Sequence, residues 1–244
     1  MIYKEVKPHL DLSHYIDAFW TVEGAAQQRV KTKILPDNCV DLVFNLGEKC
    51  QTDNGTSTIS SRKTYLVGTM TTFKDINVDS SNKLVGIRFK PSAFSSFYEY
   101  SSLHEVKDLT IEFDQALSPD IDKIEKNPVG YLNAFLLKRL IKRDPSLFKV
   151  IDDIEIAGGK ISIDMVAKKN YTTMRQLERN FKKHIGIGPK EFANVVRFRT
   201  AIFKINNNTN GKSLLDIAFE CGYYDHAHLG NEIKKYAGIV PSKF

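Results

Sequence analysis

A twelve-residue pattern is present twice in the second half of this chain, and the repeat limits the possible folds more than any other feature. The copies are FKKHIGIGPKEF at residues 181–192 and IKKYAGIVPSKF at residues 233–244, which are identical at six of twelve positions. At the same offset of 52, Thr173 corresponds to Asp225. Such self-similarity indicates one supersecondary unit that is used twice.

Each copy has the pattern of a helix, a tight turn and a second helix. In the first copy, Ser162 is an expected N-cap, and Thr173 with Gln176 has the spacing of a capping box. Leu177 and Phe181 then give the second helix a narrow apolar stripe.

The second copy has the same signals at its own positions. Ser213 is expected to cap its first helix, Gly222 to end that helix in the left-handed conformation, and Asp225 to cap the next one. Two short helices joined by a tight turn form the unit that places its second helix in the DNA major groove. Two copies in one chain are therefore expected to enter successive grooves of a duplex.

Positive charge gathers in the half of the chain that holds the repeat. Residues 1–150 carry 20 Lys and Arg against 19 Asp and Glu, a balance of +1, whereas residues 151–244 carry 15 against 10, a balance of +5. Between residues 161 and 201 there are 9 basic and 3 acidic side chains. This concentration is expected where a protein meets a polyanion, although charge alone also fits a solvated helix face.

Composition argues against several classes of protein. No apolar run approaches the roughly 18 residues of a membrane-spanning helix, and the start, MIYKEVKPHLDL, lacks the apolar region of a secretory signal. We therefore expect a cytoplasmic protein that does not contact a membrane. The three cysteines, Cys39, Cys50 and Cys221, are odd in number and widely spaced, which favours reduced thiols.

The first half of the chain has the pattern of short strands. VDLVFNL at 40–46 and KLVGIRFK at 83–90 are rich in β-branched and aromatic residues, and residues 51–61 form a polar connection. Strands that follow one another without helical spacers predict a mainly antiparallel β domain. The segment AFSSFYEY after Pro91 is expected to be a short helix that packs its aromatic side chains on the sheet.

An amphipathic helix from Val129 to Arg143 is expected to close this half, and the Asp-Pro pair after it ends the helix. The sequence therefore predicts an α+β fold. Its N-terminal part, residues 1–144, is a β-rich sensor or dimerisation domain. Residues 150–244 form an all-α DNA-binding domain with two helix-turn-helix units.

The cluster of Cys221, Asp225, His226 and His228 does not predict a metal site. The two histidines are two residues apart on a helix and point in different directions, unlike the i,i+4 pair of a helical zinc site. Asp225 is needed as a cap, and a small buried thiol is ordinary at the end of an amphipathic helix. We expect no metal and no cofactor.

Residues 213–242, SLLDIAFECGYYDHAHLGNEIKKYAGIVPS, resemble the signature of AraC/XylS transcription regulators, and the segment from Ser162 to Ala201 resembles that family's other helix-turn-helix. The front half, with FW at 19–20, ILPDNCVDLVFNLG and VGIRFKPSAF, looks like an uncharacterised sensor domain that often precedes this unit. The resemblance implies sequence-specific binding to double-stranded DNA, and contact with RNA polymerase if the protein is an activator.

In the resembling family, one stripe of the first recognition helix faces base edges. Its positions here are Arg175, Glu178, Arg179 and Lys182. Arginine suits guanine and glutamate can accept from cytosine, so we predict base contacts by Arg175, Arg179 and Glu178. The alternative is a surface charge cluster at helical spacing. The residues expected to contact the DNA backbone are Thr173, Gln176, Lys182, Lys183, Arg197, Arg199, His228, Lys234 and Lys235.

The second recognition helix departs from the family. Asn231 stands where the family usually has an arginine, and Gly230 offers no side chain and lowers helix stability by roughly 1 kcal/mol relative to alanine. Asn231 can pair with adenine and Ala227 can touch a thymine methyl, but we predict that this copy reads fewer bases. In the first turn, Tyr171 stands where the family usually has glycine, so that turn is expected to differ.

The front half lacks the sequence patterns that are typical of an enzyme. Its histidines, His9, His14 and His104, are scattered, and no G-x-S-x-G turn is present. We expect a small-molecule effector or homodimerisation to act through it. The predicted effector pocket contains Trp20, Asp37, Asp41, Phe44 and Arg88. The alternatives are that Trp20 and Phe44 are plain core residues, and that this domain binds a protein partner and no small molecule.

Overall fold

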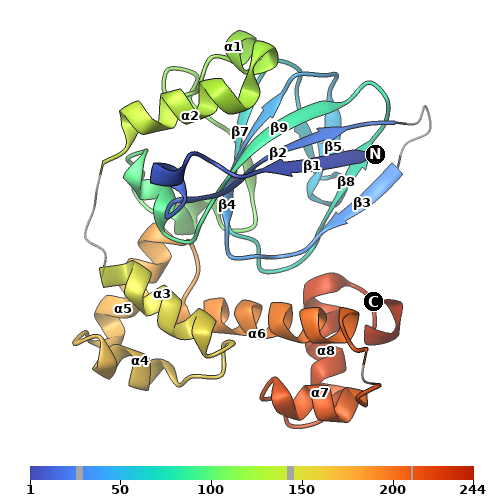
Figure 1. Cartoon of the computed structure of the whole chain (residues 1–244), viewed down its shortest axis with the longest axis vertical. Coiled ribbons are helices and arrows are strands. Elements are labelled where there is room, and N and C mark those ends of the chain that lie inside the picture. Colours follow the sequence, from blue (N-terminus) through green and yellow to red (C-terminus); the bar gives the residue numbers. More distant parts are fainter. Residues whose placement is uncertain (26–29, 142–145, 210) are drawn as a thin grey trace.

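The computed structural model describes residues 1–25, 30–141, 146–209 and 211–244, and a β-rich N-terminal part lies above a helical C-terminal part in Figure 1. The main sheet has six strands in the order β1-β2-β9-β4-β7-β10, and every neighbouring pair is antiparallel. Its strands are β1 (Ile2–Val6), β2 (Ile16–Glu23), β4 (Val40–Asn45), β7 (Thr64–Val67), β9 (Lys83–Phe89) and β10 (Thr110–Glu112).

Two small sheets and several short 3-10 turns complete this part. The small sheets pair β3 (Val30–Ile34) with β8 (Lys74–Val78) and β5 (Cys50–Thr52) with β6 (Ser57–Ile59). The 3-10 turns are η1 (Leu10–Leu12), η2 (Asp53–Gly55), η3 (Ala93–Ser96) and η4 (Leu103–Val106), and a fifth, η5 (Pro241–Lys243), ends the helical part.

The main sheet has two different apolar faces because successive side chains of a strand point to opposite sides. Phe44 belongs to the large core cluster that includes Leu136 of helix α2 (Pro128–Arg139). Val43, the preceding residue, belongs to a second cluster with Trp20 and Leu84. Helix α2 and the short helix α1 (Ile121–Lys126) therefore cover the first face.

The helical part has two hydrophobic clusters that share one long helix, α6 (Pro189–Asn206). At its start Phe192 packs with Leu177 and Phe181 in the first cluster, and farther along Phe198 packs with Leu229 in the second. Figure 1 shows α6 running between the two groups of helices. The other helices are α3 (Ser146–Ile156), α4 (Ile163–Lys169), α5 (Met174–His184), α7 (Leu214–Glu220) and α8 (His226–Ala237).

The predicted α+β architecture is confirmed, with an antiparallel β-rich part followed by a helical part. The strand patterns at 40–46 and 83–90 form β4 and β9. The segment after Pro91 forms the 3-10 turn η3 rather than an α-helix, and Phe94, Phe97 and Tyr98 are buried in the core as expected.

The closing helix of this half is shorter than predicted. It begins at Pro128, capped by Asn127, and ends at Arg139 because Leu140 takes an extended conformation and the Ile141 N–H donates to the Ser96 carbonyl. The predicted end at Arg143 and the Asp-Pro pair lie outside the described residues.

Helix α3, which the sequence pattern did not predict, contributes Val150, Ile151 and Ile154 to the first helical cluster. Within the described residues, no helix is long and apolar enough to cross a bilayer.

Candidate nucleic-acid interface

Helices α4 and α5 form the first helix-turn-helix, and a side-chain cap starts α5. The Thr173 hydroxyl accepts a hydrogen bond from the Gln176 backbone N–H at 3.2 Å, which is one half of the predicted capping box. Leu177 and Phe181 are buried against α6. This packing leaves the opposite side of α5 exposed to solvent.

Helices α7 and α8 form the second copy with more complete capping. Ser213 and Asp216 form a reciprocal capping box at the start of α7. Asp225 Oδ1 accepts from the His228 backbone N–H at 2.7 Å at the start of α8. Gly222 has a φ of +75° and ends the first helix as predicted.

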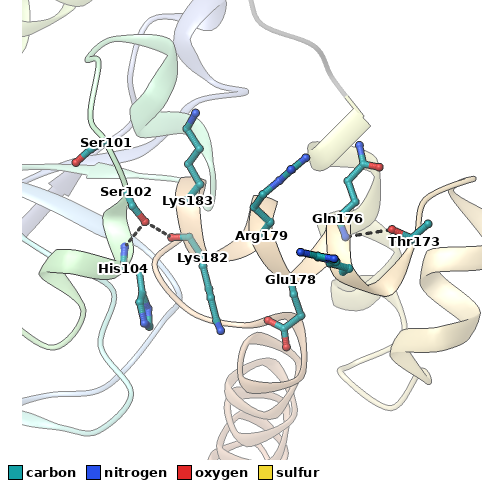
Figure 2. Close-up of a pocket in the computed structure, with 10 residues that line it drawn as sticks. Ser101, Ser102, His104, Thr173, Gln176, Glu178, Arg179, Lys182 and Lys183 are labelled. Carbon is teal, nitrogen blue, oxygen red and sulfur yellow. Dashed lines mark hydrogen bonds between the residues drawn. The ribbon is translucent and has the colours of Figure 1, made fainter.

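Four exposed cations lie along α5, namely Arg175, Arg179, Lys182 and Lys183. Within the part of the chain that the structure describes, none of them pairs with a carboxylate, whereas the nearby Lys107, Lys168 and Lys169 do. Together with Ser101, Ser102 and His104 of the N-terminal part they line a groove of about 800 Å³, shown in Figure 2. A groove with this charge suits a polyanion.

Glu178 departs from the exposed stripe that was predicted for α5. It is half-buried, and its carboxylate lies near Gly188 at the start of α6, where an added Cβ would come within 3.0 Å of Oε2. In Figure 2 its side chain points away from that of Arg179. The carboxylate thus lies beside the positive end of the α6 dipole, an environment that favours a structural role for it.

Helix α8 presents a weaker set of side chains than α5. Ala227, Asn231, Lys234 and Lys235 are all exposed, as is the ring of His228, which packs edge-on to Tyr223. Gly230 leaves the middle of this stripe empty, and nothing lies within 4 Å of the position of an added Cβ. This surface has two cations and one amide with which to meet a nucleic acid.

The two arginines of α6 have partners inside the protein. The Arg197 guanidinium lies 4.6 Å from the centre of the Tyr223 ring, which packs it between α6 and the second copy. Arg199 lies on the face of α6 that meets the N-terminal part, where its Nη1 donates to the Asp37 carbonyl at 3.2 Å. Both were expected to contact the DNA backbone, and these contacts compete with that role.

A second cavity, of about 640 Å³, lies between the sheet and α6. Of the predicted pocket residues, Trp20, Asp37, Asp41 and Arg88 line it. The prediction for Phe44 is wrong, because this side chain is fully buried on the opposite face of the sheet. The sequence did not predict the other wall, which α6 supplies with Phe198, Arg199, Ile202, Phe203 and Asn206.

A charged cluster lies at one end of this cavity. Asp41 and Arg88 are opposite one another on β4 and β9, and Trp20 Nε1 donates to Asp41 Oδ1 at 2.6 Å. Burial raises the pKa of Asp41 to about 7, against the opposing effect of Arg88. Arg88 Nε lies 3.3 Å from Asp37 Oδ2, without the geometry of a hydrogen bond. The cluster can thus form hydrogen bonds with a polar group of a ligand.

Cys221, Asp225 and His226 lie in three different environments. Asp225 is engaged as a cap, Cys221 is buried, and His226 is exposed. Across residues 1–25, 30–141, 146–209 and 211–244, no group of three or more histidine, cysteine or acidic side chains is arranged to hold a metal ion.

Comparison with known proteins supports a division of the chain into two kinds of domain. Residues 4–112 match the model of a domain of unknown function (DUF6597), and residues 166–244 match that of a helix-turn-helix domain. These two matches cover the β-rich part and both helix-turn-helix copies.

Two curated relatives are similar to the helical part. An uncharacterized HTH-type transcriptional regulator of Haemophilus influenzae is 32% identical over 82 residues, which are 34% of this chain and 27% of that protein. The HTH-type transcriptional regulator MtrA of Neisseria gonorrhoeae is 26% identical over 96 residues, or 39% of this chain and 30% of that protein. The matched part is thus less than a third of each relative.

Among solved structures, ToxT of Vibrio cholerae resembles the whole chain. At 1.65 Å resolution its structure superposes with a TM-score of 0.50 over 100% of this chain and 97% of that one, with 12% sequence identity. At this identity the likeness concerns the fold alone.

Proposed function

The chain belongs to the AraC-type helix-turn-helix regulators and carries an N-terminal DUF6597 domain, and from this we propose that it binds specific DNA sequences and regulates transcription. The observation that carries the proposal is the row of four exposed cations on α5, the second helix of a capped helix-turn-helix, which have no carboxylate partner among the described residues. A DNA target would place the protein in the cytoplasm.

Within this proposal, the two recognition helices have unequal roles. Arg175 and Arg179 contact guanine edges, with Glu178 as a lesser candidate because its carboxylate is turned towards α6. Ala227 and Asn231 make the fewer base contacts of α8. The backbone contacts come from Thr173, Gln176, Lys182, Lys183, His228, Lys234 and Lys235, with Arg197 and Arg199 less well placed.

The salt dependence of DNA affinity tests this proposal. A protein that neutralises phosphates releases counterions, so its affinity falls steeply as salt rises. The wild type should prefer a site selected from random DNA over unselected DNA, with an affinity that falls as salt rises, and the Arg175→Ala/Arg179→Ala variant should lose the preference and part of the salt dependence. Lys123→Ala, which removes an exposed cation of the N-terminal part, is the control. A preference for the selected site that survives in the double variant would refute the proposal.

We further propose that the cavity between the sheet and α6 is an effector site, with Trp20, Asp37, Asp41 and Arg88 as its polar end. The support is that one wall belongs to the N-terminal part and the other to the helix shared by both DNA-binding copies. A bound molecule would therefore contact both parts at once, and its effect could be activation through RNA polymerase or repression.

The competing proposal is that the N-terminal part, residues 1–144, binds a protein partner or a second copy of the chain, while residues 150–244 bind DNA. A thermal-unfolding screen of the full chain against a metabolite panel separates the two. A ligand that raises the melting temperature of the wild type but not that of Arg88→Ala supports the effector site. A concentration-dependent mass with no stabilising ligand supports association instead.

A further inference from the structure

One loop of the N-terminal part contacts both helix-turn-helix copies. We call residues 68–73, between β7 and β8, the bridging loop. The Thr69 hydroxyl donates to the carbonyl of Ile185, the C-cap residue of α5. The Thr72 hydroxyl donates to the carbonyl of Lys235, in the last turn of α8, at 3.1 Å. Both hydroxyls thus satisfy carbonyls that a helix leaves without partners at its C-terminal end.

Close packing at the repeated glycine reinforces these bonds in each copy. Gly186 and Gly238 correspond at the offset of 52 and have φ values of +101° and +67°. A Cβ on Gly238 would lie 2.4 Å from the ring of Phe73 in the bridging loop, and a Cβ on Gly186 would lie 3.0 Å from the carbonyl oxygen of Leu103. The N-terminal part therefore meets both copies at the same point of the repeat.

The bridging loop is itself held in place. The Asp108 carboxylate accepts hydrogen bonds from the backbone N–H and the hydroxyl of Thr71, both at 2.6 Å. The neighbouring segment also contacts the first copy, because His104 Nδ1 lies 2.8 Å from the Gly186 carbonyl oxygen. The contacts with the first and with the second copy thus belong to one surface, whose segments are joined by hydrogen bonds.

This surface adds a second connection between the recognition helices. Helix α6 links the two hydrophobic clusters, and among the described residues Lys160 Nζ also donates to the Glu220 carbonyl. Long helices bend, so a single helix leaves the angle between its two ends adjustable. The bridging loop closes a ring through α5, α6 and α8, and it limits that adjustment.

We propose that the bridging loop sets the spacing between the two DNA segments that α5 and α8 contact, so that Thr69 and Thr72 are positioning residues for DNA specificity. The inference rests on the proposed DNA-binding function. Each added base pair moves one segment by about 3.4 Å and turns it by about 35°. A protein whose recognition helices are held by both α6 and the bridging loop follows this change less readily than one in which the two hydrogen bonds of the loop have been removed.

The test uses the full chain and a set of DNAs in which the two contacted segments of a selected site are moved apart or together by single base pairs. Thr69→Val/Thr72→Val removes both hydroxyls and keeps the side-chain shape. Thr64→Val is the control, since Thr64 is as fully buried as Thr69 and its hydroxyl shares a hydrogen bond with that of Ser118 within the N-terminal part. Thermal unfolding of all three proteins checks that they are folded.

The wild type and the control should bind one spacing best. In the double variant, the preference for that spacing over its neighbours should fall by about fivefold to thirtyfold, which corresponds to the loss of one to both of the hydrogen bonds. An unchanged spacing profile overturns the inference. An equal gain in affinity at every spacing also overturns it, because the loop would then oppose DNA binding without setting a spacing. Failure of the wild type to select any DNA overturns the proposed function as well.

Discussion

Tyr171 and Gly222 occupy the same left-handed position in the turns of the two helix-turn-helix copies. Their φ values are +51° and +75°. Each N–H donates to the carbonyl three residues earlier, Lys168 at 3.2 Å and Phe219 at 3.0 Å. The turn of the first copy therefore keeps the backbone conformation of the second, although it was expected to differ and although a tyrosine stands where only glycine is free of strain.

Replacing Tyr171 by glycine should stabilise the protein. The tyrosine is 98% exposed, so its removal loses no packing, while the left-handed conformation costs a residue with a Cβ about 1 kcal/mol more than glycine. Urea unfolding should show a gain of about 1 kcal/mol or slightly less. Tyr224→Gly, at an exposed tyrosine outside the left-handed region, should give no gain, and equal effects at the two sites would contradict the explanation.

Gly230→Ala should also stabilise the chain, for a different reason. Gly230 lies inside α8, and an added Cβ meets nothing within 4 Å, so the helix gains about 1 kcal/mol of intrinsic propensity. The same change at Gly238 should destabilise, because its φ is +67° and the Cβ would meet the Phe73 ring. Thermal unfolding of both variants checks the pair, and a loss of stability in Gly230→Ala would show that the position is already packed.

The cap at Asp225 should carry measurable stability. Its carboxylate accepts the His228 N–H at the start of α8, and loss of such a cap typically costs about 1 kcal/mol. Asp225→Ala should lower the free energy of unfolding by that amount, whereas Asp225→Asn should stay within a few tenths of a kcal/mol of the wild type. If Asn and Ala were equally destabilising, the carboxylate would have a role other than capping.

Asp41 should make stability fall as the pH rises. Burial raises its pKa to about 7, so the folded state holds the proton more tightly than the unfolded state. Its stabilising contribution is complete below the ordinary carboxyl pKa of about 4 and is lost as the pH rises through about 7. Asp41→Asn, which never ionises, should therefore gain stability relative to the wild type between those values.

Urea unfolding at about pH 5 and about pH 8 measures this difference. Asp11→Asn, at an exposed carboxylate, is the control and should follow the wild type at both values. A constant difference between Asp41→Asn and the wild type would mean that the Asp41 carboxyl does not titrate in this range.

Local signals predicted the helical part well because caps, turns and apolar stripes act over a few residues. Asp225, Ser213 and Gly222 have the roles that their spacing indicated. The side-chain direction of Glu178 could not be predicted in this way, since the start of α6 that attracts it is brought near by tertiary packing.

For the cavity, the sequence contained one signal that excludes Phe44, but it contained none that predicts the wall formed by α6. Asp41 and Phe44 are three residues apart on one strand, so their opposite directions followed from the period of two and could have been predicted. In contrast, nothing local places α6 against the sheet. Phe198 and Ile202 have the spacing of ordinary core residues, and only the packing of the two parts makes them a cavity wall.

In the proposed function, α5 is the main DNA-reading helix and α8 the lesser one. Arg179 is an exposed arginine without a carboxylate partner in the described chain, whereas the matching position of α8 holds Asn231 next to Gly230. One well-placed bidentate contact discriminates by about 1–3 kcal/mol against the wrong base. Removing Arg179 should thus relax specificity more than removing Asn231.

Selection of bound sites from random DNA by the wild type, Arg179→Ala and Asn231→Ala tests this most directly. The wild type should select a two-part site with one part more constrained than the other. Arg179→Ala should lose constraint in the stronger part and bind the wild-type site about 1–3 kcal/mol more weakly, while Asn231→Ala changes little. Loss of the more constrained part in Asn231→Ala, or no selected sequence at all, would contradict the account.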